Sequence, residues 1–143
     1  MMKFKNIVKR FGDKTVYDGF SANFDGITAV LGRSGCGKTT LLNIAAKLTD
    51  YEGSVEVIGE TSYIFQQPRL VKNLTVSENL TLIGADKAQA EKMLKEVGVD
   101  GGLYPKQLSG GMADRVSLAR AFVRGGGTLL MDEPFRGLDI GLK

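Results

Sequence analysis

Residues 32–39 read GRSGCGKT and decide the fold of this chain. They satisfy the pattern G-x-x-x-x-G-K-[ST], and the almost continuously apolar run Ile27–Leu31 before them predicts a buried strand. After them, apolar residues recur at helical spacing over Lys38–Lys47 and predict a helix. Strand, glycine-rich loop and helix in this order are the context that the pattern requires, so we expect them to begin a βαβ unit of an α/β fold.

A glycine-rich loop of this kind can bind the phosphate groups of a nucleotide. Glycines let the backbone wrap closely around a phosphate chain with its N–H groups pointing inward, and the helix N-terminus adds a partial positive charge. Lys38 is expected to reach the β and γ phosphates, and the Thr39 hydroxyl is expected to bind Mg²⁺. The residues expected to bind the nucleotide are Gly32, Ser34, Gly35, Cys36, Gly37, Lys38, Thr39 and Thr40. On these residues alone, a glycine-rich turn with a chance lysine remains the alternative.

Length and composition indicate one globular domain. The 143 residues are 43% hydrophobic and 24% charged, and the net charge of +3 comes from basic residues scattered singly, which argues against a nucleic-acid-binding arm. The single cysteine, Cys36, cannot form a disulfide within the chain and fits a reducing compartment. No run approaches the ~20 apolar residues of a membrane helix, and the N-terminus lacks the apolar core of a signal peptide. We therefore expect a soluble, cytoplasmic chain.

The remaining patterns predict strands and helices on both sides of the loop. Strands are expected at Lys3–Val8, Lys14–Phe24, Val55–Ile58, Ser62–Phe65 and Thr128–Met131. Helices are expected from the capping-box pattern at Thr75, at Asp86–Val97 and at about Met112–Arg124. We expect a β-rich part with the phosphate loop at 1–71, a helical insert at 72–124, and a final strand with its loop at 125–143.

Three further motifs follow the phosphate loop in a fixed order. LSGG stands at 108–111, Asp132-Glu133 follows a predicted strand, and Gly137-Leu138-Asp139 comes next. This ordered set resembles the ABC ATPase family over nearly the whole chain. The chance of finding the phosphate loop and LSGG together in this order is about one in ten thousand. The resemblance implies a P-loop NTPase fold of the ABC ATPase type, with ATP and Mg²⁺ as cofactors.

The resemblance also assigns roles to residues of these motifs. Ser109 and Gly111 would bind the γ-phosphate of ATP held by a second subunit, because an anion site at this helix N-terminus cannot close on its own chain's nucleotide. Asp132 would hold Mg²⁺ through water, and Glu133 would polarise the attacking water at the carboxyl edge of the sheet. The nucleotide-binding residues expected from the later motifs are Ser109, Gly110, Gly111 and Asp139.

Gln66 and Phe11 complete the expected site. Gln66 resembles the Q-loop glutamine, which contacts Mg²⁺ and links the site to a membrane partner, and Gln67 is its alternative by register. Phe11 matches the aromatic residue that stacks on adenine, usually a tyrosine in the family, while a place in the core is the alternative for this ring. The residues expected in catalysis are Lys38, Gln66 and Glu133, and those expected around Mg²⁺ are Thr39, Gln66 and Asp132.

The sequence departs from the family pattern in two ways. Met112 replaces the usual glutamine after LSGG, which removes a polar side chain from the signature helix. The chain has no histidine, whereas the family carries a switch histidine beyond the point where Lys143 ends this sequence. We therefore expect a C-terminally truncated domain that lacks the strand between 27–31 and Thr128–Met131. Such a chain should be marginally stable, expose sheet edges and hydrolyse ATP negligibly on its own.

The resemblance implies an ATP-binding subunit that hydrolyses ATP in a head-to-tail dimer and drives a membrane transporter. Its expected partners are a second ATP-binding subunit in a homodimer, membrane permease subunits and a substrate-binding protein, but no nucleic acid, at the inner face of the cell membrane. Segments Pro68–Leu70 and Leu74–Leu80 look like importers of nitrate, sulfonate and taurine. The alternatives are a truncated fragment that binds nucleotide or partner without turnover, a soluble ABC ATPase of translation or DNA repair, and a P-loop kinase, in which LSGG and Asp132-Glu133 have no role.

Overall fold

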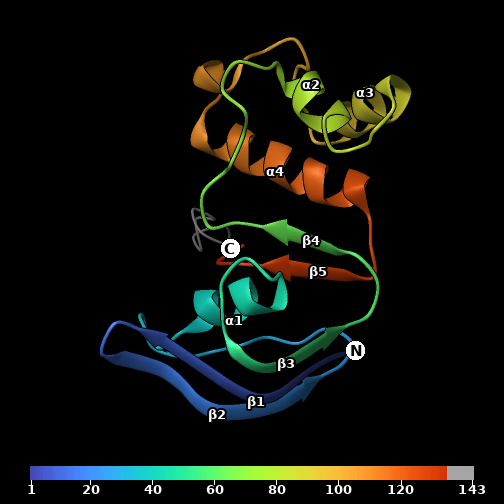
Figure 1. Cartoon of the computed structure of the whole chain (residues 1–143). Coiled ribbons are helices and arrows are strands. Elements are labelled where there is room, and N and C mark those ends of the chain that lie inside the picture. The colour runs from blue at the N-terminus through green and yellow to red at the C-terminus, as the bar shows by residue number, and fades with distance from the viewer. Residues whose placement is uncertain (135–143) are drawn as a thin grey trace, which may run out of the picture. The chain divides into compact units, whose positions relative to one another are not determined.

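The computed structural model describes residues 1–134 and falls into two compact units, Met1–Thr61 and the part of the chain from Ser62 onward (Figure 1). The elements in chain order are β1 Met2–Phe11, β2 Lys14–Phe24, α1 Lys38–Ala45, β3 Glu52–Val57, β4 Thr61–Ile64, α2 Val76–Thr81, α3 Lys87–Glu96, the 3₁₀ helix η1 Pro105–Gln107, α4 Gly110–Arg124 and β5 Thr128–Met131. Among residues 1–134, none of these helices has the length and apolar character needed to span a membrane.

An antiparallel three-stranded sheet of order β2-β1-β3 forms much of the first unit. A tight hairpin joins β1 to β2 at Gly12, whose φ of 56° lies in the left-handed region that glycine adopts without strain. β1 is the central strand and pairs with both neighbours. The strands predicted at Lys3–Val8 and Lys14–Phe24 are confirmed.

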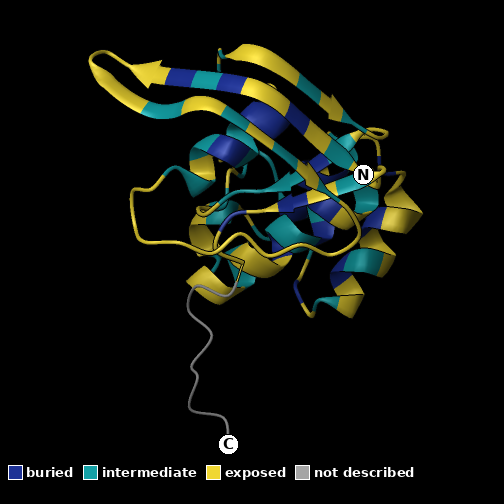
Figure 2. Cartoon of the chain, turned by 90° about the horizontal axis from the view of Figure 1, so that it is seen from below, coloured by how far each residue is buried: buried dark blue, intermediate teal, exposed yellow. Residues whose placement is uncertain are grey.

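Side chains of β1 and α1 supply the core of the first unit. Phe4 and Ile7 of β1 and Ile44 of α1 are buried almost completely. The Phe4 ring meets the rings of Phe20 and Phe24 edge to face, with centroid separations of 6.1 and 5.7 Å, a geometry that aromatic pairs prefer. Along β1, the buried residues Phe4, Ile7 and Lys9 are separated by exposed or half-buried ones, whereas β2 carries only half-buried and exposed residues (Figure 2).

The strand predicted at 27–31 is wrong. This segment leads into the phosphate loop, has no regular secondary structure, and pairs with no strand of the described part of the chain. Its last residue, Leu31, is 89% exposed. A buried-strand pattern needs a neighbouring strand for its N–H and C=O groups and a surface for its side chains to pack against. Residues 1–134 supply neither, so an apolar sequence alone does not make this segment a strand.

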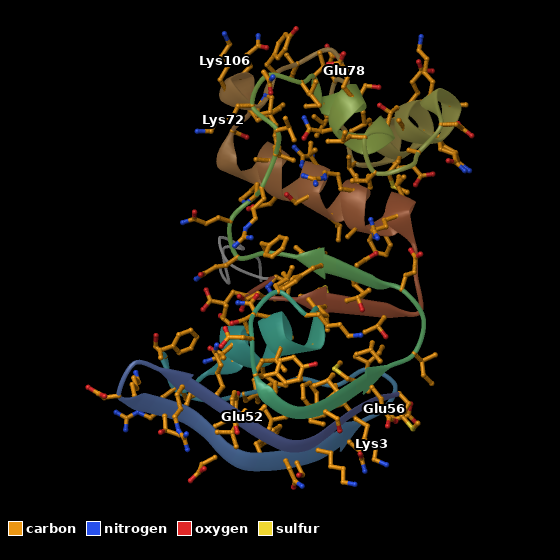
Figure 3. The ribbon with its side chains drawn as sticks, viewed as in Figure 1. Lys3, Glu52, Glu56, Lys72, Glu78 and Lys106 are labelled. Carbon is orange, nitrogen blue, oxygen red and sulfur yellow. The ribbon has the colours of Figure 1, made fainter. Side chains whose placement is uncertain are left out.

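Three α-helices and the 3₁₀ helix form the greater part of the second unit. Their buried core consists of Val76, Leu80, Ala85, Ala90, Leu94, Val99, Val116 and Ala119. The capping box predicted from Thr75 is confirmed, because Glu78 N donates to the Thr75 hydroxyl and Thr75 N donates to the Glu78 carboxylate at the start of α2. Figure 3 labels Glu78 beside α2. The hydrogen bond from the Thr75 backbone N–H, and then the Thr75 hydroxyl, hold the pKa of the Glu78 carboxyl below its ordinary value. Asp86 and Gln89 form a second capping box at α3.

β4 and β5 pair although the helices lie between them in the sequence, and the two strands run in the same direction (Figure 1). Near their beginnings, the Ser62 hydroxyl donates to the Gly125 carbonyl oxygen. At their ends, Asp132 N donates to Ile64 O at 3.0 Å. The carboxyl ends of the two strands are therefore adjacent, which is the edge where parallel sheets bind ligands.

A fully buried amide, Asn79, fixes the turn that precedes α2. Its Oδ1 accepts a hydrogen bond from Val71 N at 2.8 Å. Its Nδ2 donates to the carbonyl oxygens of Val71, Leu74 and Thr75 at 3.1, 3.3 and 2.9 Å. One side chain thus gives a partner to Val71 N and to the Leu74 carbonyl oxygen, and adds a second bond to the Val71 and Thr75 carbonyl oxygens, which already accept from backbone N–H groups.

Replacing Asn79 with Ala should lower the free energy of unfolding by about 2–3 kcal/mol, because the turn loses these partners inside the fold. Asn73→Ala is the matched control, since Asn73 is exposed in the same segment and its loss should cost within about 0.5 kcal/mol. Urea denaturation followed by circular dichroism measures both. Equal stabilities of the two variants would contradict the role given to Asn79.

Candidate active site

Two glycines with left-handed backbone conformations shape the phosphate loop. φ is 76° at Gly35 and 107° at Gly37, values that residues with side chains rarely adopt. A Cβ on Gly37 would stand 2.7 Å from Val16 Cγ1 of β2, closer than two carbon atoms approach, so the loop backbone lies directly against β2. The other predicted loop residues are exposed or half-buried in the first unit: Gly32, Ser34, Cys36, Thr39 and Thr40.

The ammonium of Lys38 folds back over this loop. Its Nζ donates to the carbonyl oxygens of Gly32 at 2.8 Å and Arg33 at 3.0 Å. α1 begins at Lys38 without a side-chain cap and without an acidic residue in its first turn, so these residues do not neutralise its positive end. A cation and a helix N-terminus thus flank the same loop, an arrangement that can bind a phosphate chain.

Tyr17 of β2 holds the loop and was not singled out from the sequence. Its hydroxyl donates to the Gly37 carbonyl oxygen at 3.1 Å, and the same oxygen accepts the first helical bond from Leu41 N at 2.9 Å. Because C=O and the next N–H point in opposite directions across a trans peptide, this bond also fixes the direction of the Lys38 N–H. Burial, and then the charge of Cys36, raises the pKa of the Tyr17 hydroxyl, so it remains a donor at neutral pH. Nothing in the sequence distinguishes Tyr17 from any half-buried strand residue.

Phe11 lies at the exposed end of the β1–β2 hairpin. Its side chain is 53% exposed, which argues against the alternative of a core position. Phe11 pairs with Lys14 of β2, and Val16 and Tyr17 further along β2 are the residues that meet the phosphate loop. The ring therefore stands at the end of the hairpin that touches the loop, where a nucleotide base could stack on it.

Gln66 and Glu133 meet at the carboxyl ends of β4 and β5. Each is the second residue after its strand, and Gln66 Nε2 donates to Glu133 Oε2 at 2.7 Å. The bond comes from Gln66 and not from Gln67, the alternative in the sequence. A carboxylate and an amide that are distant in the sequence are thus held together at one edge of the second unit's sheet.

The backbone separates the two neighbouring carboxylates. Asp132 is only 6% exposed, and its N–H extends the pairing of β5 with β4. Glu133 is exposed and has a φ of 51°, a left-handed conformation that is rare outside glycine and is concentrated at functional sites. Beside them, burial and then the Asp132 charge raise the pKa of the Tyr63 hydroxyl to about 12, against the lowering effect of Arg69.

The predicted donors to a metal fit Mg²⁺. Hydroxyl, carboxylate and amide oxygens are hard ligands, and Thr39, Asp132 and Gln66 offer one of each. Among residues 1–134, no cluster of three His, Cys, Asp or Glu side chains could hold a metal ion by itself. Within the second unit, Asp132 and Gln66 offer two oxygen donors, a number that suits Mg²⁺, which keeps several waters and takes one or two protein ligands together with phosphate oxygens. Thr39 belongs to the first unit, and the other two residues belong to the second.

Ser109 is the N-cap of α4. Its Oγ accepts a hydrogen bond from Met112 N at 3.3 Å, so the helix begins at Gly110 and not at Met112 as predicted. A Cβ on Gly110 or Gly111 would meet no described atom within 4 Å, which leaves room at the helix N-terminus for an anionic group. Met112, which replaces the glutamine of the family pattern, packs against the core of the second unit. Asp139 lies outside the described residues, and its role stays a prediction.

These features define the class of P-loop nucleoside triphosphatases. The class has a phosphate loop at the start of a helix and polar side chains, here a carboxylate and an amide, at the ends of adjacent strands. Within that class, the chain belongs to the ABC transporter family, whose model matches residues 19–136. It is 42% identical over 140 residues to the aliphatic sulfonates import ATP-binding protein SsuB 1 of Pseudomonas syringae pv. syringae (strain B728a), covering 92% of this chain and 59% of that protein. It is 40% identical over 148 residues to SsuB of Corynebacterium glutamicum, covering 94% and 61%. The chain spans about three-fifths of the length of these relatives.

Solved structures show the same fold. The ATP-binding cassette MJ0796, a dimer in a post-hydrolysis state bound to ADP and Pi, matches with a TM-score of 0.86 at 28% identity, over 98% of this chain and 77% of that one. A second dimeric structure of the same cassette gives a TM-score of 0.84. The predicted fold of an ABC ATPase is confirmed.

Replacing Gly37 with Ala should displace the loop from β2, because the new Cβ would overlap Val16 and alanine is strained at a φ of 107°. Overpacking of this kind costs enough to weaken the binding of Mg-ATP by about tenfold or more in calorimetry. Gly26→Ala is the control, since Gly26 also has a positive φ of 56° but no atom within 4 Å of the added Cβ. Its affinity should stay within about twofold of the parent. A Gly37→Ala chain that binds as tightly as this control would show that the close approach is not needed.

Proposed function

We propose that this chain binds Mg-ATP and, paired head to tail with a second ATP-binding subunit, hydrolyses it to drive transport across a membrane. The observation that carries the hydrolytic part is the 2.7 Å bond from Gln66 Nε2 to Glu133 Oε2, which fixes a carboxylate at the ligand-binding edge of the sheet. Two named similarities support the proposal: the import ATP-binding proteins among the relatives, and the cassette dimer bound to ADP and Pi.

In the proposed reaction, water attacks the γ-phosphorus while the bond to the bridging oxygen breaks, which gives ADP and phosphate. Glu133 takes the proton of the attacking water, and the bond from Gln66 orients its carboxylate. Lys38 exchanges its present bonds to the loop carbonyls for the β and γ phosphate oxygens. The loop N–H groups and the N-terminus of α1 bind the remaining negative charge.

Mg²⁺ would be held by the Thr39 hydroxyl, by the Gln66 amide oxygen, and through water by Asp132. When bound, the ion neutralises part of the phosphate charge. Asp132 suits this part because it is nearly buried and its backbone is fixed by the bond to Ile64, so the carboxylate keeps its place whether or not the ion is present.

The other half of each site would come from a second copy of the chain. Ser109 and Gly111 offer a capped helix N-terminus with open space, which suits the γ-phosphate of a nucleotide bound by that copy. The partners in the assembled system would be permease subunits and a substrate-binding protein at the inner face of the membrane. Aliphatic sulfonates are the proposed class of substrate, because the relatives are named for their import.

Nucleotide binding without turnover is the second candidate, and it is favoured by segment 27–31, which pairs with no strand within residues 1–134. This segment leads directly into the phosphate loop, so the loop is fixed by β2 and α1 and not by a sheet strand of its own. Calorimetry with Mg-ATP together with a phosphate-release assay separates the two candidates. Binding with release supports the ATPase, and binding without release supports the second candidate.

Lys38→Ala should lower the affinity for Mg-ATP by about 100-fold or more, because two hydrogen bonds to charged phosphate oxygens are lost at about 1.5–3 kcal/mol each. Lys92→Ala removes the same charge from an exposed position on α3 and should change the affinity by less than about twofold. Isothermal calorimetry compares the two. Unchanged affinity in Lys38→Ala would remove the phosphate-loop assignment.

Glu133→Gln should keep Mg-ATP affinity within about twofold while phosphate release falls by about 100-fold or more, because the amide has nearly the shape of the carboxylate but accepts no proton. Glu96→Gln, an exposed position at the end of α3, is the control and should release phosphate at the parent rate. Turnover in Glu133→Gln within tenfold of the parent would mean that another group takes the proton.

A further inference from the structure

Lys9 is a buried cation beneath an exposed aromatic ring. Its side chain is 3% exposed, and its Nζ lies 2.8 Å from Asp50 Oδ1 and 4.5 Å from the centroid of the Phe11 ring. Asp50 is almost fully exposed and stands in the link between α1 and β3. The hydrogen bond from Lys9 holds the pKa of the Asp50 carboxyl below its ordinary value, which favours the carboxylate form that the ion pair with Lys9 requires.

The charge of Lys9 is costly at this position. Lysine is almost never fully buried unless it is paired, because its ammonium loses its water. Phe4 and Ile7, the other buried residues of β1, are apolar, and a methionine at position 9 would fill a similar volume without that cost. In the described part of the chain, the ammonium contacts the Asp50 carboxylate and the face of the Phe11 ring. A methyl group would bind neither of them in the same way.

The strand geometry explains why the cation and the ring meet. Residues two apart on a strand lie on the same side, so Lys9 and Phe11 share one side of β1. The ammonium covers one face of the ring, while the ring as a whole remains 53% exposed. An exposed phenylalanine at a hairpin end would otherwise sample several rotamers, and a contact of this type restrains it.

The same lysine is linked to the phosphate loop through β2. Lys9 pairs with Tyr17 across the hairpin, and the Tyr17 hydroxyl bonds to the Gly37 carbonyl oxygen of the loop. A ring fixed relative to Lys9 is therefore also fixed relative to the backbone that would hold the phosphates. ATP spans such a pair of sites, with its base at one end and its phosphates at the other.

We propose that Lys9 is a positioning residue for nucleotide binding: anchored by Asp50, it holds the Phe11 ring in the orientation that stacks on the adenine base. The inference rests on the proposed function, because it takes ATP as the ligand. Lys9 itself contacts neither base nor phosphate. Its loss should therefore weaken the part of the affinity that depends on the base and leave the part that depends on the phosphates.

The test compares ATP with tripolyphosphate, both with Mg²⁺, by calorimetry on the whole chain. Lys9→Met should weaken ATP binding by about 3- to 10-fold, the range of one aromatic contact, and leave tripolyphosphate within about twofold. Arg10→Met is the matched control, since it removes an exposed positive charge from the neighbouring position of the same strand and should change neither affinity by more than about twofold. Lys9→Arg should restore ATP binding, because a guanidinium also stacks on a ring.

A direct readout of the ring is available because the chain contains no tryptophan. In a Phe11→Trp background, the single indole should show restricted motion in time-resolved fluorescence anisotropy and should be quenched by ATP. Adding Lys9→Met or Asp50→Asn should increase its motion before any nucleotide is added. Asp50→Asn keeps the shape of the side chain and an oxygen that can accept a hydrogen bond from Lys9 Nζ, so it weakens the anchor without leaving the ammonium unpartnered and keeps the test valid if the Lys9 variant folds poorly.

The outcomes separate the inference from the proposed function. If the indole does not respond to ATP in the parent background, stacking at position 11 is overturned and the inference falls with it. If it responds to ATP but neither its motion nor ATP affinity depends on Lys9, only the inference is overturned. Equal weakening of ATP and tripolyphosphate by Lys9→Met would show a general structural role and would also overturn it.

Discussion

The close approach of the loop backbone to β2 at Gly37 is the constraint on which the candidate site of the first unit depends. Val16 leaves no space for a side chain there, and the Tyr17 hydroxyl holds the Gly37 carbonyl oxygen. Together they set the direction of the first N–H groups of α1 and the path from which Lys38 reaches back over the loop. The β1–β2 hairpin, which precedes the loop in the sequence, thus fixes the phosphate-binding geometry. The glycines permit the backbone conformation and the close approach to β2 that this geometry requires.

In the second unit, the pairing of β4 with β5 positions the candidate site residues. The bond from Asp132 N to Ile64 O sets the register of β5 against β4, and this register places Gln66 opposite Glu133. Side chains alternate along a strand, so a slip of one residue would turn the carboxylate to the other side of the sheet. The left-handed φ of Glu133 is compatible with this arrangement because the neighbouring hydrogen bonds hold it in place.

The parts that could be predicted from the sequence are those decided by near neighbours along the chain. The phosphate-loop pattern and the capping box of Thr75 with Glu78 each depend on residues within a few positions. The segment 27–31 was predicted wrongly because burial of an apolar run depends on a strand from elsewhere, and residues 1–134 do not provide one. No sequence pattern predicts the role of Tyr17, because its partner Gly37 lies in a distant loop. The same holds for the pair of Lys9 with Asp50, because Asp50 lies in the link after α1.

In the head-to-tail dimer proposed above, the cap of α4 has a consequence for how the two copies would communicate. The Ser109 hydroxyl accepts a hydrogen bond from the first turn of its own helix and keeps its hydrogen for another acceptor. A hydroxyl that accepts one bond is polarised and donates a second one more strongly, so the two bonds reinforce each other. An anion delivered by the other copy would therefore tighten the first turn of α4, and its departure would let that turn fray. Nucleotide bound by one copy would in this way order the first turn of α4 in the other copy.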